Sequence, residues 1–174
     1  MVSVAMNESR LEPTRLERLL YRLEAQHESL NWACREITNR PGVVFELGLG
    51  HGRTYDHLRR NLPEREIFVF DREVDCFPDC TPDAAHLILG KLSTTLPQAR
   101  ERFAGKAILV NSDVGTYDDG YNREVAALVS ANLAPLLAPG ALVLSDLPLD
   151  LPQARRLPLP DNVRSEQYFI YRSP

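Results

Sequence analysis

Short apolar runs alternate with amphipathic stretches along residues 41–146 of the chain. The amphipathic stretches carry apolar residues at helical spacing, most clearly over residues 53–62 and 121–138. Strands that alternate with helices are typical of a parallel sheet with helices on both faces. The pattern therefore predicts an α/β fold with a doubly wound, mainly parallel sheet. The apolar runs predicted as its buried strands are residues 43–45, 67–70, 86–90, 107–113 and 141–146.

The helix boundaries follow from capping residues and breakers. Thr94, Thr95 and Pro97 suit the cap and first turn of a helix that ends at Phe103. Pro139 and Gly140 are expected to end the helix of residues 121–138, because proline and glycine interrupt regular helices.

Residues 1–40 predict one long helix in front of the sheet. Thr14, with Glu17 three residues later, has the spacing of a capping box, and the helix is expected to run to about Ile37. Its apolar stripe is expected to cover the core or to form a dimer contact, with a lid over a ligand site as the alternative. The stripe consists of Leu16, Leu19, Leu20, Leu23, Leu30 and Ala33.

The segment after Asp146 is short, and closely spaced prolines exclude a regular helix there. Residues 167–171 predict a final strand, paired with a short strand near residues 155–159. These strands complete a sheet of six to seven strands in one globular unit of residues 41–174, against which residues 1–40 pack. The prolines are Pro148, Pro152, Pro158 and Pro160.

The composition is that of one ordinary globular domain. The chain has 174 residues, of which 44% are hydrophobic and 25% are charged, and a net charge of −4. This charge disfavours a nucleic-acid partner, so a small-molecule substrate is expected. No apolar run reaches membrane-spanning length, and residues 1–6 lack the features of a secretory signal, which predicts a cytoplasmic protein. Three cysteines and scattered histidines predict neither a disulfide framework nor a zinc site.

A glycine-rich turn follows the first apolar run. Glycines at alternate positions let the backbone bend sharply and approach a ligand, and the following helix offers free N–H groups. The dinucleotide fingerprint needs a third glycine where Arg53 stands, and the phosphate-loop motif needs a Gly-Lys-Ser/Thr run that is absent here. The turn therefore predicts a nucleotide-like ligand and disfavours both of these motifs. Its residues are Glu46, Gly48, Gly50 and Gly52.

Acidic and polar residues end the next strands. Asp71 stands about twenty residues beyond the turn, where α/β nucleotide folds bind ribose hydroxyls, and a turn-forming aspartate is the alternative. The fourth run ends in Asn111, Ser112 and Asp113, and residues 114–120 form either a functional loop or a solvated turn. Because parallel strands place ligands at their carboxyl ends, these residues are predicted to border one site.

Taken in order, these features resemble the motifs of class I S-adenosylmethionine-dependent methyltransferases. The resemblance rests on E-x-G-x-G-x-G at residues 46–52, on Asp71 and Asp113, and on Pro139 and Gly140, where the family has L-x-P-G-G. It implies a Rossmann-like fold, S-adenosyl-L-methionine as the cofactor, S-adenosyl-L-homocysteine as the product, and in-line methyl transfer. The short C-terminal segment indicates a small variant with a reduced substrate cap.

The resemblance also implies a set of site residues. Glu46 would order the glycine turn, Asp71 would bind the ribose, and Asp113 would lie near the methionine amino group or the acceptor. The implied cofactor-binding residues are Glu46, Gly48, Leu49, Gly50, His51, Gly52, Thr54, Asp71, Arg72, Gly90, Lys91, Leu92, Asn111 and Asp113. The candidates for taking a proton from the acceptor are Asp113, His51, Tyr117 and Asp146.

Catechol-type methyltransferases hold a divalent cation with acidic residues at the positions of Asp113 and Asp146. Leu147 and Pro148 stand where that class supplies an amide ligand, so no metal is predicted. The sequence thus predicts a methyltransferase for a small-molecule acceptor, with a homodimer or higher homo-oligomer as one possible assembly. Two alternatives stay open. One is an inactive cofactor-binding module, favoured by the short C-terminal segment, and the other is an NAD-linked oxidoreductase, disfavoured by Arg53.

Overall fold

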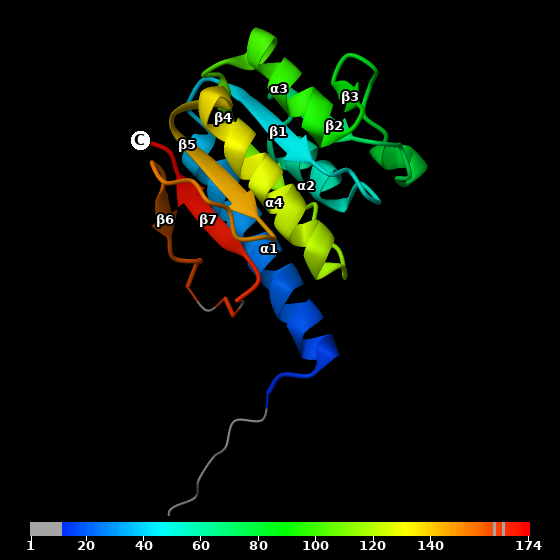
Figure 1. The fold of residues 1–174 in the computed structure, drawn as a ribbon, viewed down its shortest axis with the longest axis vertical. Helices are drawn as coiled ribbons and strands as arrows, with labels where there is room; N and C mark the ends of the chain where they lie inside the picture. The colour runs from blue at the N-terminus through cyan, green and yellow to red at the C-terminus, as the bar shows by residue number, and fades with distance from the viewer. Residues whose placement is uncertain (1–11, 162, 165) are drawn as a thin grey trace, which may run out of the picture.

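The computed structural model describes residues 12–174 except residues 162 and 165, so the expectation for residues 1–6 lies outside the described residues. A seven-stranded sheet forms the middle of three layers (Figure 1). One pair of helices packs on each face, which confirms the predicted α/β architecture with a long N-terminal helix. The helices are α1 (Arg15–Ile37) and α2 (Arg53–Asn61) on one face, and α3 (Leu92–Phe103) and α4 (Asp119–Leu133) on the other.

The strand order is β3-β2-β1-β4-β5-β7-β6. Neighbouring strands from β1 to β5 pair in parallel, whereas β7 lies antiparallel between β5 and β6. The sheet is therefore mainly parallel, and the C-terminal segment supplies the predicted pair of strands, which lie antiparallel at one end of the sheet. The strands are β1 (Val43–Leu47), β2 (Ile67–Asp71), β3 (Leu87–Leu89), β4 (Ala107–Ser112), β5 (Leu137–Ser145), β6 (Arg155–Leu157) and β7 (Phe169–Arg172).

The central strands are apolar on both sides because both faces of the sheet are covered. Within β1, Val44 belongs to the core under α1 and α2, and Phe45 belongs to the core under α3 and α4. The ring of Phe45 makes edge contacts with Phe70 of β2 and Phe103 of α3. The two cores hold the carboxyl ends of β1, β2 and β4 in register.

Two predicted helix boundaries are wrong. The helix expected over residues 121–138 ends at Leu133, because Pro135 cannot donate the next helical hydrogen bond, and Ala134–Leu136 form a 3₁₀ turn instead. Pro139 and Gly140 consequently lie within β5 rather than at a helix end. α3 starts at Leu92, so Pro97 lies inside this helix rather than in its first turn.

α1 begins with the predicted capping box between Thr14 and Glu17 and ends at Ile37. Its second half packs into the core, with Leu30 and Ala33 buried. Only this half of the predicted stripe covers the core, because the first turns of α1 extend past the edge of the sheet (Figure 1). The exposed members of the stripe are Leu16, Leu19, Leu20 and Leu23.

Two connections that follow sheet strands contain no α-helix. The chain between β2 and β3 has only a 3₁₀ turn at Pro78–Cys80, and the chain between β5 and β6 has no helix. No helix among the residues described by the structure is long and apolar enough to cross a membrane.

Candidate functional site

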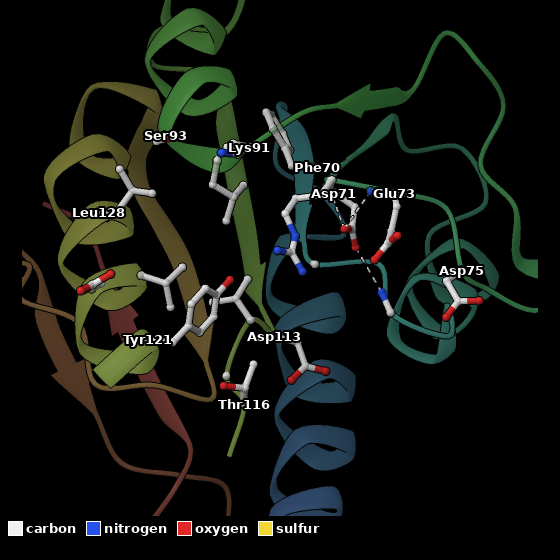
Figure 2. Close-up of a pocket in the computed structure, with 18 residues that line it drawn as sticks. Phe70, Asp71, Glu73, Asp75, Lys91, Ser93, Asp113, Thr116, Tyr121 and Leu128 are labelled. Carbon is white, nitrogen blue, oxygen red and sulfur yellow. Dashed lines mark hydrogen bonds between the residues drawn. The ribbon is translucent and has the colours of Figure 1, made fainter. Parts of the chain in front are cut away.

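A cavity of about 620 Å³ lies at the carboxyl ends of β1, β2 and β4. β1 and β4 are neighbours in the sheet, but the chain leaves β1 toward one face and β4 toward the other, which is where open α/β sheets bind ligands. Figure 2 shows Asp71 and Asp113 on one side of the cavity and Tyr121 and Leu128 of α4 on the other.

The glycine turn, residues 48–52, forms one wall. Gly48, Gly50 and Gly52 have φ angles of +86°, +48° and +84°, which other residues rarely adopt. A Cβ on Gly52 would lie 2.5 Å from Cβ of Cys80, whereas no atom lies within 4 Å of a Cβ built on Gly50. Gly52 therefore permits packing against the β2–β3 connection, and Gly50 leaves open space beside the cavity.

Asp71 holds the glycine turn in place. Its Oδ2 accepts hydrogen bonds from the backbone N–H groups of Leu49 at 2.6 Å and Gly50 at 3.3 Å. Its Oδ1 accepts from the backbone N–H of Arg72 at 2.6 Å. One carboxylate thus connects the end of β2 to the turn that follows β1, and it does so at the surface of the cavity (Figure 2).

Glu46 lies beneath the turn and is completely buried. Oε1 accepts a hydrogen bond from the Thr54 hydroxyl in the first turn of α2, and Oε2 accepts from Nδ2 of Asn111 at 2.9 Å. The Tyr168 hydroxyl donates to Oδ1 of Asn111 at 3.2 Å, so the network reaches the connection before β7. Burial raises the pKa of Glu46 to about 8, which favours its neutral form at neutral pH.

The β4–α4 loop, residues 113–118, forms the opposite wall. Asp146, one residue beyond β5, accepts hydrogen bonds from the backbone N–H groups of Val114 at 3.3 Å and Gly115 at 2.8 Å. Burial, followed by the nearby charge of Asp113, raises the pKa of Asp146 to about 7. The Asn122 side chain accepts from the backbone N–H of Thr116 at 2.8 Å and closes the loop onto α4.

Asp113, the first residue of this loop, is bound by two side chains of α1. Its Oδ2 accepts from Nε2 of Gln26 at 3.0 Å, and its Oδ1 lies 3.4 Å from a guanidinium nitrogen of Arg22. Both partners come from α1, about 90 residues earlier in the chain. α1 is therefore part of the site, because two of its side chains orient a carboxylate that borders the cavity.

The structure brings half of the predicted cofactor residues to the cavity surface: Gly48, Gly50, Asp71, Arg72, Lys91, Leu92 and Asp113. The others lie behind or beside this surface. Glu46, Thr54 and Asn111 are buried beneath the turn. Leu49 is buried in the core, and Gly52 and Gly90 pack against Cys80 and Thr95.

Among the candidate proton acceptors, only Asp113 lines the cavity. Asp146 lies under the β4–α4 loop, where its carboxylate occupies the space beside Gly115. His51 is exposed and points toward the carbonyl of Asp75, with Nδ1 at 3.3 Å from that oxygen. Tyr117 is fully exposed to solvent.

Several cavity residues were not predicted from the sequence. Four residues on the first turns of α4 recur at helical spacing directly after a polar loop, and this pattern is a signal that would have found the face of α4 that borders the site. Arg22 and Gln26 carry no comparable signal, because their contact with Asp113 depends on the tertiary packing of α1. The residues on the α4 face are Tyr121, Glu124, Val125 and Leu128.

The chain is similar to known methyltransferases along its length. A family model described as S-adenosyl-L-methionine methyltransferase matches residues 13–173. The S-adenosyl-L-methionine methyl transferase from Silicibacter pomeroyi DSS-3 is 40% identical, with a TM-score of 0.89, and the match covers 94% of this chain and 100% of that chain. TrmN from Thermus thermophilus shares the fold at 13% identity and a TM-score of 0.58, over 83% of this chain and 48% of that chain. A search of curated protein sequences gives no match.

The cavity suits S-adenosyl-L-methionine. Gly50 leaves the backbone of the turn open to a ligand, because even an added Cβ at this position would meet no atom within 4 Å. The carboxylate of Asp71 lies at the cavity surface, where a ribose hydroxyl would replace its longer contacts with the backbone N–H groups of Gly50 at 3.3 Å and Glu73 at 3.4 Å. Asp113 borders the cavity between its two walls, and Lys91 and Leu92 border the end near β3. Within the described residues, no group of three or more His, Cys, Asp or Glu side chains is arranged to hold a metal ion.

Proposed function

The chain belongs to the S-adenosyl-L-methionine methyltransferase family, and from this premise we propose that it methylates a small-molecule acceptor by in-line transfer. The observation that carries the proposal is the division of the cavity into two walls. The glycine turn and Asp71 form the cofactor side, and the β4–α4 loop with the first turns of α4 forms the acceptor side. The cavity volume of about 620 Å³ lies within the range of small-molecule sites.

The charge around the cavity supports a small acceptor rather than a nucleic acid. Acidic side chains outnumber basic ones in the lining, and the whole chain carries a net charge of −4. A surface that binds a polyanion needs a basic patch, and the residues that line this cavity do not form one. The acidic lining residues are Asp71, Glu73, Asp75, Asp113 and Glu124, and the basic ones are Arg72 and Lys91.

The proposed chemistry requires little covalent work from the protein. When bound, S-adenosyl-L-methionine supplies a sulfonium methyl group that is already activated for displacement. The protein must align the acceptor, exclude water and accept a proton if the acceptor atom carries one. We assign the proton to a carboxylate oxygen of Asp113, which borders the cavity and is oriented by Arg22 and Gln26. Asp146 is then a positioning residue that holds the loop beside Asp113.

Calorimetric titration tests the cofactor side. S-adenosyl-L-homocysteine is expected to bind with one-to-one stoichiometry, and NADH is expected to give no heat above a buffer blank. The family assignment already goes against the NAD-linked oxidoreductase. Lack of binding by the homocysteine product would contradict the proposed cofactor site.

A transfer assay tests the acceptor side. Tritiated methyl groups are followed into pools of small phenols, amines, carboxylic acids and thiols, with a transfer RNA pool as the nucleic-acid arm. Label in a small-molecule pool, reduced at least 100-fold by Asp113→Asn with the homocysteine product still bound, is the expected result. Label only in RNA overturns the small-acceptor proposal. Binding without label in any pool favours the inactive-module alternative.

A further inference from the structure

A buried tyrosine, Tyr168, ends the hydrogen-bond network beneath the glycine turn. It stands directly before β7, is 2% exposed, and donates a hydrogen bond to Oδ1 of Asn111 at 3.2 Å. Asn111 in turn donates to Glu46. We propose that Tyr168 is a positioning residue for S-adenosyl-L-methionine, because its hydroxyl orients the amide of Asn111 and, through Glu46, the glycine turn. This role concerns the cofactor and does not depend on which acceptor is methylated.

The register of the sheet explains why a tyrosine is needed. Glu46 of β1 and Asn111 of β4 are paired across neighbouring strands, and both lie on the face covered by α1 and α2, like the core residues two positions earlier. The next partner in this row is Leu144 of β5, whose side chain cannot form a hydrogen bond. β7 lies beyond β5 (Figure 1), about 10 Å from β4 at the usual strand spacing. A serine or threonine before β7 would be too short, whereas the ring of Tyr168 carries its hydroxyl across β5 to Asn111.

The hydroxyl of Tyr168 favours one orientation of the Asn111 amide. An amide has an acceptor oxygen on one side and a donor nitrogen on the other, and here Oδ1 faces Tyr168 while Nδ2 donates to Oε2 of Glu46 at 2.9 Å. Burial, followed by the charges of nearby carboxylates, raises the pKa of Tyr168 well above its ordinary value, so the hydroxyl keeps its proton and remains a donor. Without this hydroxyl, Oδ1 would lose a buried donor, and the amide could turn its nitrogen away from Glu46.

Glu46 carries the effect to the glycine turn. Glu46 lies in β1 just before the turn, and Thr54 lies in the first turn of α2 just after it. The hydrogen bond from the Thr54 hydroxyl to Glu46 therefore ties the two ends of the turn together. A Glu46 carboxyl group that loses the amide of Asn111 is held by fewer bonds, so the ends of the turn can shift relative to each other. Gly50, which lines the cavity between these ends, would shift with them and weaken cofactor binding.

Calorimetric titration with S-adenosyl-L-homocysteine tests the role of the hydroxyl. Tyr168→Phe keeps the ring and is expected to raise the dissociation constant about fivefold, as the loss of one hydrogen bond would. Tyr171→Phe is the matched control, because Tyr171 is buried on β7 and its hydroxyl accepts from the backbone N–H of Leu149 at 2.9 Å, in the core under α3 and α4. This variant also loses one buried hydrogen bond but is expected to bind the product as the wild type does. Urea denaturation gives the stability that each variant loses.

Each other outcome of the titration counts against the role. Wild-type affinity in Tyr168→Phe would overturn it directly. Equal weakening in Tyr168→Phe and Tyr171→Phe would also overturn it, because the effect would then follow from reduced stability alone. A wild-type chain that does not bind the product would remove the cofactor site itself, and the role of Tyr168 with it.

A double-mutant cycle tests the path through Asn111. Asn111→Leu removes the amide, so adding Tyr168→Phe to this variant is expected to change the dissociation constant further by less than about twofold. A full fivefold effect in this background would overturn the path, since Tyr168 would then act without Asn111. Circular dichroism establishes that each variant is folded, and Asn111→Ala replaces Asn111→Leu if leucine unfolds the protein.

Discussion

The two walls of the cavity are held by different kinds of contact. The glycine turn is fixed from below by Glu46 and from the side by Asp71, which lie 8 and 22 residues from their partners Thr54 and Leu49. The β4–α4 loop depends on Asp146, 31 residues beyond Gly115, and Asp113 depends on Gln26, 87 residues earlier. The cofactor side thus combines contacts between nearby segments with one distant buried contact, from Glu46 to Asn111, 65 residues later, whereas the acceptor side is tied to the end of β5 and to α1.

This difference indicates which wall of the cavity tolerates amino-acid substitution. A turn held by a buried network and by glycines in the left-handed region leaves little freedom for substitution. A loop held by one carboxylate and one asparagine offers more freedom, as a site that determines the acceptor requires.

The largest effect is expected at the glycine turn. Gly52→Ala should lower the free energy of unfolding by about 2–4 kcal/mol, because its Cβ would overlap Cβ of Cys80 at a positive φ angle. Gly105→Ala is the control, since Gly105 has a φ of +66° with no atom within 4 Å of the added Cβ, and should cost about 1 kcal/mol. Urea denaturation measures both. Equal losses would mean that the turn is not tightly packed against Cys80.

The pH dependence of stability tests the buried network under the same turn. The pKa of Glu46 is about 8 in the folded protein against an ordinary value of 4.5, so the folded state binds the proton more tightly. Stability from this group is therefore full below pH 4.5 and is lost as the pH rises toward 8, by on the order of 3 kcal/mol.

The glutamine in Glu46→Gln cannot ionise. Between pH 5 and pH 8 the unfolding free energy of this variant should therefore fall by about 3 kcal/mol less than that of the wild type. The Thr54 hydroxyl can accept a hydrogen bond from the new amide, which preserves packing. Glu64→Gln, at an exposed position, is the control and should follow the wild-type curve. If the unfolding free energies of the wild type and Glu46→Gln changed with pH in parallel, the pH dependence would come from a group other than Glu46.

Asp71 connects the turn to the proposed ribose position. Asp71→Asn should weaken binding of S-adenosyl-L-homocysteine by about tenfold, or about 1.4 kcal/mol, because an amide has one acceptor oxygen in place of two. Calorimetric titration gives the dissociation constant. Asp79→Asn, on the 3₁₀ turn outside the cavity, is the control and should bind the product as the wild type does. If Asp71→Asn bound S-adenosyl-L-homocysteine as tightly as the wild type, Asp71 would only hold the glycine turn and would not bind the ribose.

The smallest effect is expected on the acceptor side. Asp146→Asn keeps one acceptor oxygen and loses one hydrogen bond to the β4–α4 loop, which should cost about 1 kcal/mol at pH 6, below its pKa of about 7. Hydrogen exchange should become faster at Val114 and Gly115, while affinity for S-adenosyl-L-homocysteine stays the same. Reduced product affinity would show that the two walls are coupled.

The cofactor side of the cavity could be predicted from the sequence better than the acceptor side. Apolar runs and glycine spacing predict β1, β2, the glycine turn and Asp71, because these depend on local sequence and on the rule that ligands bind at strand ends. The role of α1 in orienting Asp113 was not predictable, since helical spacing does not reveal which distant group a polar side chain contacts. The stripe of α1 shows a second limit. Periodicity predicted the helix correctly but did not distinguish Leu30 and Ala33, which cover the core, from Leu16 and Leu23, which lie beyond it.

The two outermost strands of the sheet are short. β3 and β6 each have three residues, and β6 contains Arg155 and Arg156. Unpaired backbone groups at a sheet edge invite edge-to-edge aggregation, which short and charged edge strands discourage. The protein is therefore expected to resist growth into sheet-extended polymers, even with exposed leucines elsewhere on its surface.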